Sequence, residues 1–271
     1  MKKKRVNKSA LAREFQISRA SIYYQPKMRL RDEQLREQIL SVLEEHPFYG
    51  HRRVALHLGR NHKPILRVMK LFKIKPIMRK PRKPFKPEDR AREPSGYCNY
   101  LKWLCPLHTG IFWASDFTYF WFIDQFYFLA TIIDVYSREI VGTAFGAFHN
   151  KELVMEALKD ALKKHKPPKY LHSDQGSEYN SEAYVNLAGS HGVLISMSAK
   201  GKPWENGFQE SFYSQFKLEV GPLKLFSELG ELVEAIYRQI HYYNYDRIHT
   251  ALKMSPKKYA RLHSTHKDKL F

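Results

Sequence analysis

Three acidic residues that lie far apart in the chain have the types and contexts needed for metal-dependent chemistry. Asp116 lies inside a run of strand-forming residues, Asp174 directly follows a short apolar run, and Glu210 lies in an amphipathic segment. Carboxylates from separate elements suit the oxygen-preferring cations Mg²⁺ and Mn²⁺, and two such ions can neutralise the charge of a phosphoryl transfer. Taken alone, Asp116 would be a solvent-facing residue of a strand. The three acids together indicate a metal site.

The first acid lies in a predicted sheet. β-Branched and aromatic residues dominate three stretches, 111–122, 126–133 and 139–145, and polar breaks separate them. This pattern predicts a three-stranded antiparallel meander. Asp116 lies in the middle of its first strand, where a buried charge needs a partner or a metal.

The second acid ends a predicted strand. An amphipathic helix over 152–164 and the break Pro167-Pro168 come before a short strand over 170–173, which Asp174 follows. Open α/β sheets bind their ligands at the carboxyl ends of strands. Asp174 is therefore expected at such an edge.

The third acid lies on a predicted helix that begins near Pro203 and runs to about 219. Phenylalanine recurs at every fourth residue on one side, at Phe208, Phe212 and Phe216. The opposite side carries Asn206, Glu210, Ser214 and Lys217. Glu210 is therefore expected to face away from the buried stripe of its own helix. A second amphipathic helix, 229–243, follows with Leu232, Ile236 and Ile240 as its stripe.

Five strings accompany the acids, and 35 residues separate Asp174 from Glu210. The strings are Trp113-Ala114-Ser115-Asp116-Phe117-Thr118-Tyr119, Ile133-Asp134-Val135-Tyr136-Ser137-Arg138, His172-Ser173-Asp174-Gln175-Gly176, Lys200-Gly201-Lys202-Pro203 with Asn206 and Glu210-Ser211-Phe212, and Tyr243-Asn244-Tyr245-Asp246-Arg247-Ile248-His249. In this order and spacing the chain resembles the insertion-sequence transposases of the D,D(35)E type. Their second reading frame encodes a catalytic core like that of retroviral integrases. The resemblance covers nearly the whole chain.

The resemblance implies a fold, a reaction and a role for each acid. The fold would be α/β, a ribonuclease H-like core with a five-stranded mixed sheet flanked by helices, preceded by a small all-α helix-turn-helix region. Asp116 would bridge two Mg²⁺ or Mn²⁺ ions, Asp174 would hold one and Glu210 the other. The enzyme would be a polynucleotidyl transferase that cleaves the element ends and joins their 3′-hydroxyls to a target strand.

Other acids compete with these three. Asp134 lies in a strand of the same sheet and is expected to be structural, with Arg138 or the neighbouring backbone as its partner. Glu178 is expected to be a surface acid. Glu219 lies a quarter turn away from the catalytic face of its helix.

Positive charge is concentrated in the first third of the chain. The 271 residues carry a formal net charge of +19, and residues 1–92 hold 26 Lys and Arg against eight acids. An excess confined to one segment is expected of a protein that binds a polyanion. No basic amphipathic helix with an aromatic face is present, which favours nucleic acid over a membrane surface.

This basic segment contains two predicted helix-turn-helix units. In residues 8–24 Gln16-Ile17 makes the turn, and Arg19 and Ser21 begin the helix that would meet base edges. In the second unit Arg52 and Arg53 lie in a string that resembles the helix-turn-helix region before the core of this family. Its helices are expected near 31–45, 54–58 and 65–72. A helical bundle without DNA contact is the alternative, which the charge excess disfavours.

Further cations are expected to contact DNA near the acids. The resemblance to integrases places a DNA-contacting cation two turns after the catalytic glutamate, which is Lys217 here. Other candidates are Lys200 and Lys202 just before this helix, Asn206 on it, and Arg247 and His249 in the tail that follows the second helix.

The chain is predicted to have four parts. Residues 1–74 form the helix-turn-helix DNA-binding region, 75–97 a basic proline-rich linker, 98–256 the catalytic core and 257–271 a basic C-terminal tail. Cys98 and Cys105 lack the spacing of a zinc knuckle, so packing is their expected role.

The expected partners are double-stranded DNA, as terminal repeats and as target, and other copies of the chain on that DNA. The product of an upstream reading frame is a further possible partner. No apolar run reaches the ~18 residues of a membrane span and no signal peptide is visible, so a nucleoid-associated place in the bacterial cytoplasm is expected. Two other functions remain open: a non-catalytic DNA-binding protein derived from a transposase, and another ribonuclease H-like nuclease.

Overall fold

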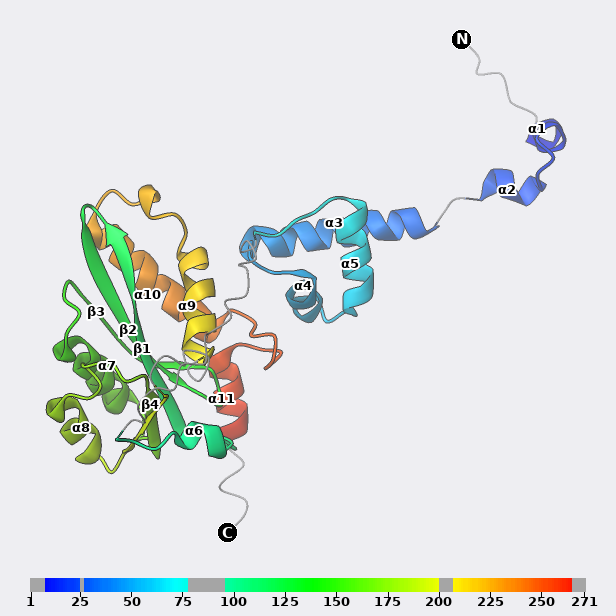
Figure 1. The fold of residues 1–271 in the computed structure, drawn as a ribbon. Helices are drawn as coiled ribbons and strands as arrows, with labels where there is room; N and C mark the ends of the chain where they lie inside the picture. Colours follow the sequence, from blue (N-terminus) through cyan, green and yellow to red (C-terminus); the bar gives the residue numbers. More distant parts are fainter. Residues whose placement is uncertain (1–7, 25–26, 78–95, 200–206, 265–271) are drawn as a thin grey trace. The chain divides into compact units, whose positions relative to one another are not determined.

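A computed structural model describes residues 8–24, 27–77, 96–199 and 207–264 of the chain. The chain forms two compact units, Met1–Ile77 and Met78–Phe271. The described part of the first unit contains helices alone, and the second contains a sheet with helices packed against it (Figure 1). Most of the predicted linker lies outside the described residues. None of the described helices combines the length and apolarity that a membrane-spanning helix needs.

The first unit begins with a pair of short helices, α1 (Lys8–Glu14) and α2 (Arg19–Tyr23). Gln16 takes a positive φ of 52° between them, which reverses the chain direction. The Ser18 hydroxyl accepts the backbone N–H of Ser21 at 3.1 Å and caps α2. The predicted turn is therefore present, and the second helix begins at a serine cap.

A second helical group consists of α3 (Lys27–Glu45), α4 (His51–His57) and α5 (His62–Leu71). The predicted helices are present and begin three or four residues earlier than expected. Ile39, Val54 and Ile65 are fully buried in this group. The Arg67 guanidinium donates to both carboxylate oxygens of Asp32, at 2.5 and 2.7 Å, and so joins α5 to α3. This hydrogen bonding lowers the pKa of Asp32.

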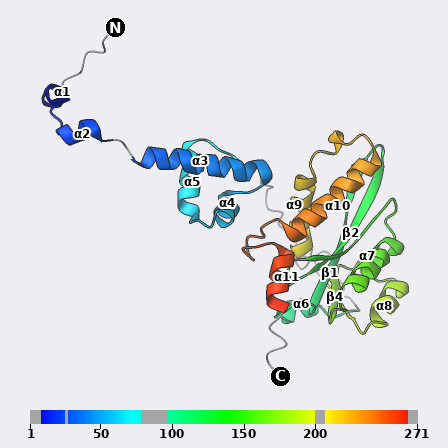
Figure 2. The same ribbon diagram turned by 180° about the vertical axis from the view of Figure 1, so that it is seen from behind.

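Within the described residues of the second unit, five strands form one mixed sheet in the order β3-β2-β1-β4-β5. The strands are β1 (Phe112–Phe122), β2 (Gln125–Asp134), β3 (Ile140–Gly146), β4 (Tyr170–Ser173) and β5 (Leu194–Met197). The first three form the predicted antiparallel meander (Figure 1). β4 lies beside β1 and runs parallel to it (Figure 2), and β5 pairs in parallel with β4. The predicted five-stranded mixed sheet is confirmed.

Helices cover both faces of the sheet. On one face α7 (Lys151–Lys164) and α8 (Glu182–Gly189) pack against Trp113 and Ile132. On the other, α9 (Gly207–Val220) and α10 (Leu229–Tyr245) pack against Phe120 and Leu129. Gly142 allows α7 to approach β3, because a Cβ atom there would lie 2.4 Å from the Ala157 carbonyl oxygen. The predicted stripe of α10 (Leu232, Ile236 and Ile240) is buried in the second cluster.

Shorter elements complete the second unit: α6 (Tyr100–Trp103), the 3-10 helix η2 (Leu223–Leu225) and α11 (Pro256–Ser264). The backbone N–H of Met197 donates to the Cys98 carbonyl at 3.4 Å, so the segment before β1 lies along the edge strand β5. Cys98 and Cys105 are both exposed, so the prediction that they pack in the core is wrong. The segment expected to be a basic tail begins as the helix α11.

Candidate active site

Asp116 and Asp174 lie side by side on neighbouring strands. The register pairs Ala114 of β1 with His172 of the parallel strand β4. Two residues further along each strand are Asp116 and Asp174, and adjacent strands lie ~4.8 Å apart. β4 ends at Ser173, and Asp174 is exposed beyond it. The structure thus brings two of the three predicted acids together at the carboxyl end of β4.

The Asp116 side chain belongs to the sheet face that α9 covers. Asp116 is paired with Thr131 of β2, and directly paired residues of antiparallel strands project to the same face. The Thr131 hydroxyl lies 2.8 Å from the hydroxyl of Tyr213 in α9. The Asp116 side chain is half-buried. The backbone N–H of Phe117 donates to its carboxylate at 2.8 Å and so holds the carboxylate close to its own strand.

A glycine shapes the loop that carries Asp174. The Gly176 N–H donates to the Asp174 carboxylate at 3.0 Å. A Cβ atom at Gly176 would lie 2.7 Å from the nearer carboxylate oxygen of Glu178 and 3.1 Å from that of Asp174. Any other residue at this position would therefore displace one of the two carboxylates.

Two buried polar side chains fix α9 against the strand that carries Asp116. Gln209 is fully buried and donates to the carbonyl oxygens of Ala114, at 2.5 Å, and Thr131, at 3.2 Å. The Tyr213 hydroxyl donates to the Asp116 carbonyl at 2.7 Å. Burial, and secondarily the Asp116 carboxylate, raises the pKa of Tyr213 well above its usual range, so the phenol stays a donor. These contacts hold α9 directly over β1.

Glu210 follows Gln209 in the chain and lies in the first turn of α9. Its backbone is described, whereas its side chain lies outside the described part of the chain. Phe212 and Phe216 are buried as predicted, and the side chain of Phe208 is also outside the described part. Glu210 is therefore carried by the helix that packs on β1, the strand that contains Asp116.

Lys217 lies on the same helix two turns after Glu210. Its ammonium is 4.5 Å from the ring centroid of Tyr119 and 5.4 Å from that of Phe120. The cation therefore reaches β1 just beyond Asp116. The other predicted contacts before this helix, Lys200, Lys202 and Asn206, lie outside the described residues.

Arg247 has a structural role that the sequence did not reveal. Its side chain is 4% exposed and donates at 2.8 Å to Glu219, whose side chain is 2% exposed. Gln215 and Gln239 donate to the same carboxylate, at 2.9 and 2.7 Å. The pair joins α9 to the chain after α10, so the prediction that Arg247 contacts DNA does not fit its burial. His249 is half-buried and forms a β-bridge with Met254.

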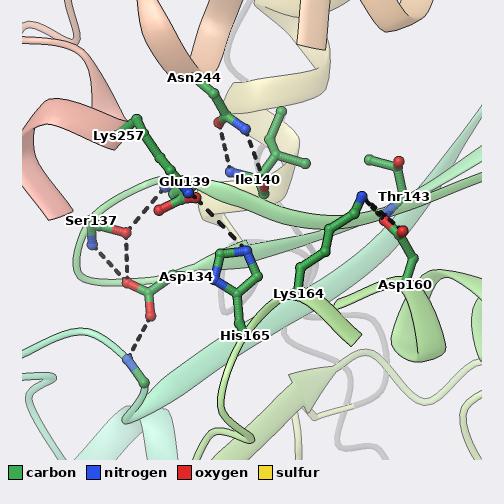
Figure 3. A network of polar contacts seen from close by, with 11 residues as sticks. Asp134, Ser137, Glu139, Ile140, Thr143, Asp160, Lys164, His165, Asn244 and Lys257 are labelled. Carbon is green, nitrogen blue, oxygen red and sulfur yellow. Dashed lines mark hydrogen bonds and ion pairs between the residues drawn. The ribbon is translucent and has the colours of Figure 1, made fainter. Parts of the chain in front are cut away.

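Asp134 stabilises the turn between β2 and β3. Its carboxylate accepts the backbone N–H groups of Gly110 and Ser137, both at 2.8 Å, and the Ser137 hydroxyl at 2.9 Å (Figure 3). The nearby Glu139 carboxylate lies 2.5 Å from the Lys257 ammonium of α11. Backbone donors thus engage Asp134, which confirms the expectation that it is structural.

Glu178 is not the surface acid that the sequence predicts. Its side chain is 10% exposed and lies 3.1 Å from Nε2 of His149. The His149 ring in turn lies against Phe117, with ring centroids 4.0 Å apart. The loop after Asp174 is therefore tied to the strand that carries Asp116. No sequence pattern predicts this pair, because its members lie in two separate loops.

The predicted base-reading residues of the first unit lie on its surface. Arg19 and Arg52 are exposed, and Arg53 is half-buried with its guanidinium 5.7 Å from the Tyr49 ring centroid. Ser21 is exposed, and its hydroxyl lies 2.8 Å from that of the cap residue Ser18. Exposure makes the two arginines Arg19 and Arg52 accessible to a partner.

Comparisons with known proteins agree with this geometry. Two family profiles, both described as integrase core domain, match residues 107–203 and 191–256. The transposase InsK for insertion sequence element IS150 of Escherichia coli (strain K12) is 30% identical over 255 residues, which are 90% of this chain and 89% of the relative. The transposase for insertion sequence element IS904 of Lactococcus lactis is 36% identical over 156 residues, which are 56% of this chain and 62% of that relative.

A solved structure supports the fold. A chain of the simian T-cell lymphotropic virus intasome in complex with PP2A regulatory subunit B56 gamma matches with a TM-score of 0.53 and 17% identity, over 84% of this chain and 75% of that chain. The fold and the profiles define a DDE-type polynucleotidyl transferase, a class of enzyme that depends on divalent metal. The chain belongs to the insertion-sequence transposases with an integrase-like core, and its function is DNA transposition. The predicted resemblance is confirmed, and the two alternative functions are not favoured.

Proposed function

We propose that Asp116, Asp174 and Glu210 form the active site of this transposase and hold two Mg²⁺ ions. The observation that carries the proposal is the β1–β4 register, which sets the two aspartates side by side beneath the helix of Glu210. The donor set fits the cation, because carboxylate oxygens are the ligands that Mg²⁺ prefers. When bound, two ions neutralise phosphate charge and align the attacking and leaving oxygens.

Residues of this chain position the three acids relative to one another. Gln209 and Tyr213 fix α9 on β1 and thereby fix the position of Glu210 along that strand. Gly176 and the Glu178–His149 pair hold the Asp174 loop. The expected outcome of this placement is cleavage at the element ends and attack of the released 3′-hydroxyls on target DNA.

Conservative variants of the three acids test this assignment. Asp116→Asn, Asp174→Asn and Glu210→Gln should each abolish Mg²⁺-dependent cleavage and strand transfer on a duplex that carries the terminal repeat of the element. DNA binding should be nearly unchanged, because the amides keep the shape of the acids. Asp124→Asn, at an exposed turn, is the control and should remain active. Joining by one of the three variants at the wild-type rate would remove that residue from the site.

We propose that the first unit recognises the element ends through Arg19, Ser21, Arg52 and Arg53, and that copies of the chain assemble on the DNA. An upstream reading-frame product would join that assembly where one is made. The charge excess of residues 1–92 and the exposure of two of the arginines support this division. Arg52→Ala should weaken binding and reduce the slope of log affinity against log salt by ~0.9. Lys151→Ala, an exposed cation of the second unit, is the control, and equal slopes for both variants would contradict the proposal.

A further inference from the structure

Three aromatic side chains stand exposed at the far end of the β1–β2 hairpin. Tyr119, Trp121 and Phe126 are 55%, 54% and 46% exposed. The Phe126 ring lies edge-on to both others, with centroids 5.4 Å from Tyr119 and 4.6 Å from Trp121. They form one strip, the hairpin platform, because all three project to the same face of the sheet. An apolar strip of this kind on the surface marks a binding site.

The hairpin platform is rigid. On the opposite face Phe120 and Phe122 are buried in the cluster with α9 and α10. The connecting residues Ile123 and Asp124 both have positive φ, 43° and 61°, as in the two-residue turns that match strand twist. The exposed rings are thus presented by an ordered element, and a ligand that stacks on them does not have to order a loop.

The hairpin platform shares the strand β1 with Asp116 but lies on its other face, because Asp116 projects to the side that α9 covers and Tyr119 and Trp121 project to the opposite side. Tyr119 lies three residues after Asp116 on β1, about 10 Å along a strand. β4 pairs with β1 only from Phe112 to Ala114, so the platform end of β1 runs past the end of β4. Lys217 places its ammonium over the Tyr119 ring from the helix that carries Glu210. Lys217 of α9 therefore reaches the platform across the edge of β1 that extends beyond β4, and joins the face of the acids to the face of the aromatic rings.

We propose that the hairpin platform stacks unpaired nucleobases of the DNA strand that leaves the cleavage site across the edge of β1, while Lys217 binds a phosphate at that edge. This inference rests on the proposed function of the acids. Aromatic rings beside a cation are the combination that binds single-stranded DNA, because every base offers a face for stacking. A second copy of the chain fits less well. Three half-exposed rings offer roughly 300 Å², whereas a stable interface needs ~800 Å² from each partner.

The test compares two duplexes of the terminal repeat in full-length protein without divalent metal. One is fully paired, and the other has its three terminal bases unpaired on one strand, with 2-aminopurine as the middle base. Wild-type protein should bind the frayed duplex more tightly and quench the 2-aminopurine. Trp121→Ala and Phe126→Ala should each lose about tenfold in affinity for the frayed duplex and lose the quenching. Affinity for the paired duplex should stay the same.

Three further variants separate stacking from other roles. Trp121→Tyr keeps an aromatic face and should retain quenching, whereas Trp121→Leu keeps apolar area alone and should lose it. Trp103→Ala, which removes a more exposed tryptophan on α6, should behave as wild type. Equal preference for the frayed duplex in wild type and Trp121→Leu overturns the proposal. A change of oligomeric state in sedimentation without a change in quenching also overturns it, because the strip would then be an interface between copies. Intact wild-type quenching together with Mg²⁺-dependent strand transfer by Asp116→Asn would instead count against the assignment of the acids and leave the platform in place.

Discussion

Gln209 offers a direct test of how the catalytic helix is positioned. Gln209→Met keeps the side-chain volume and removes three hydrogen bonds, those donated to the Ala114 and Thr131 carbonyls and the one accepted from the Thr131 hydroxyl. At about 1 kcal/mol for each bond, the free energy of unfolding should fall by ~3 kcal/mol. In a unit of this size each kcal/mol lowers Tm by roughly 2–4 °C, so a decrease of about 6–12 °C is expected.

The effect on activity should exceed the effect on stability. Without the bonds to Ala114 and Thr131, α9 is free to shift along β1, and a displacement of about 1 Å can lower a rate ~100-fold. Strand transfer should therefore fall by about that factor at 20 °C, where the variant is still folded. Urea unfolding measures the first quantity, and a single-turnover joining assay measures the second.

Gln215→Met is the matched control for this variant. Gln215 lies on the same helix and makes one described hydrogen bond, to Glu219 at 2.9 Å. It should lose at most ~1 kcal/mol of stability and keep wild-type activity. Folded Gln209→Met protein that joins DNA at the wild-type rate would show that the position of α9 does not depend on Gln209.

Two further predictions concern buried or paired charges. Glu219→Gln leaves the Arg247 guanidinium buried without its anionic partner. The free energy of unfolding, measured in urea, should therefore fall by ~3–5 kcal/mol, while DNA affinity is retained. A decrease below ~1 kcal/mol would contradict the structural role of the pair. The pKa of Asp32 lies below its ordinary value of 3.8 because Arg67 donates hydrogen bonds to its carboxylate. The Asp32–Arg67 pair therefore stabilises the first unit above about pH 4, and this stabilisation is lost as pH falls through the pKa of the folded state. Between pH 5 and 2 the Tm of wild type should fall more steeply than that of Asp32→Asn, and identical pH profiles would refute this.

The meander, α7 and β4 could be predicted because their patterns are long or sharply bounded. Strand-forming residues dominate β1 and β2, and polar residues separate the two strands. The helix α8 and the strand β5 could not be predicted from the sequence. α8 has eight residues and β5 has four, which are too few to show a periodic pattern. The five-stranded count came from family resemblance alone.

Some residues of the candidate site could also be predicted from the sequence, and others could not. The acids could be found because each follows a local pattern and a fixed spacing. The Arg247–Glu219 and His149–Glu178 pairs each join residues about 30 positions apart, and nothing local distinguishes them from exposed charges. The burial of Gln209 was missed because the phenylalanine stripe alone defined the inner face of its helix.

The contact between Lys257 and Glu139 decides where the catalytic unit can be truncated. The second family profile ends at residue 256, the first residue of α11. A fragment cut there would leave Glu139 buried without its ammonium and would remove Tyr259, whose ring packs 5.5 Å from that of Tyr136. A shortened catalytic fragment for crystallisation or for fusion to another DNA-binding domain should therefore extend through Ser264, and any tag should follow that residue.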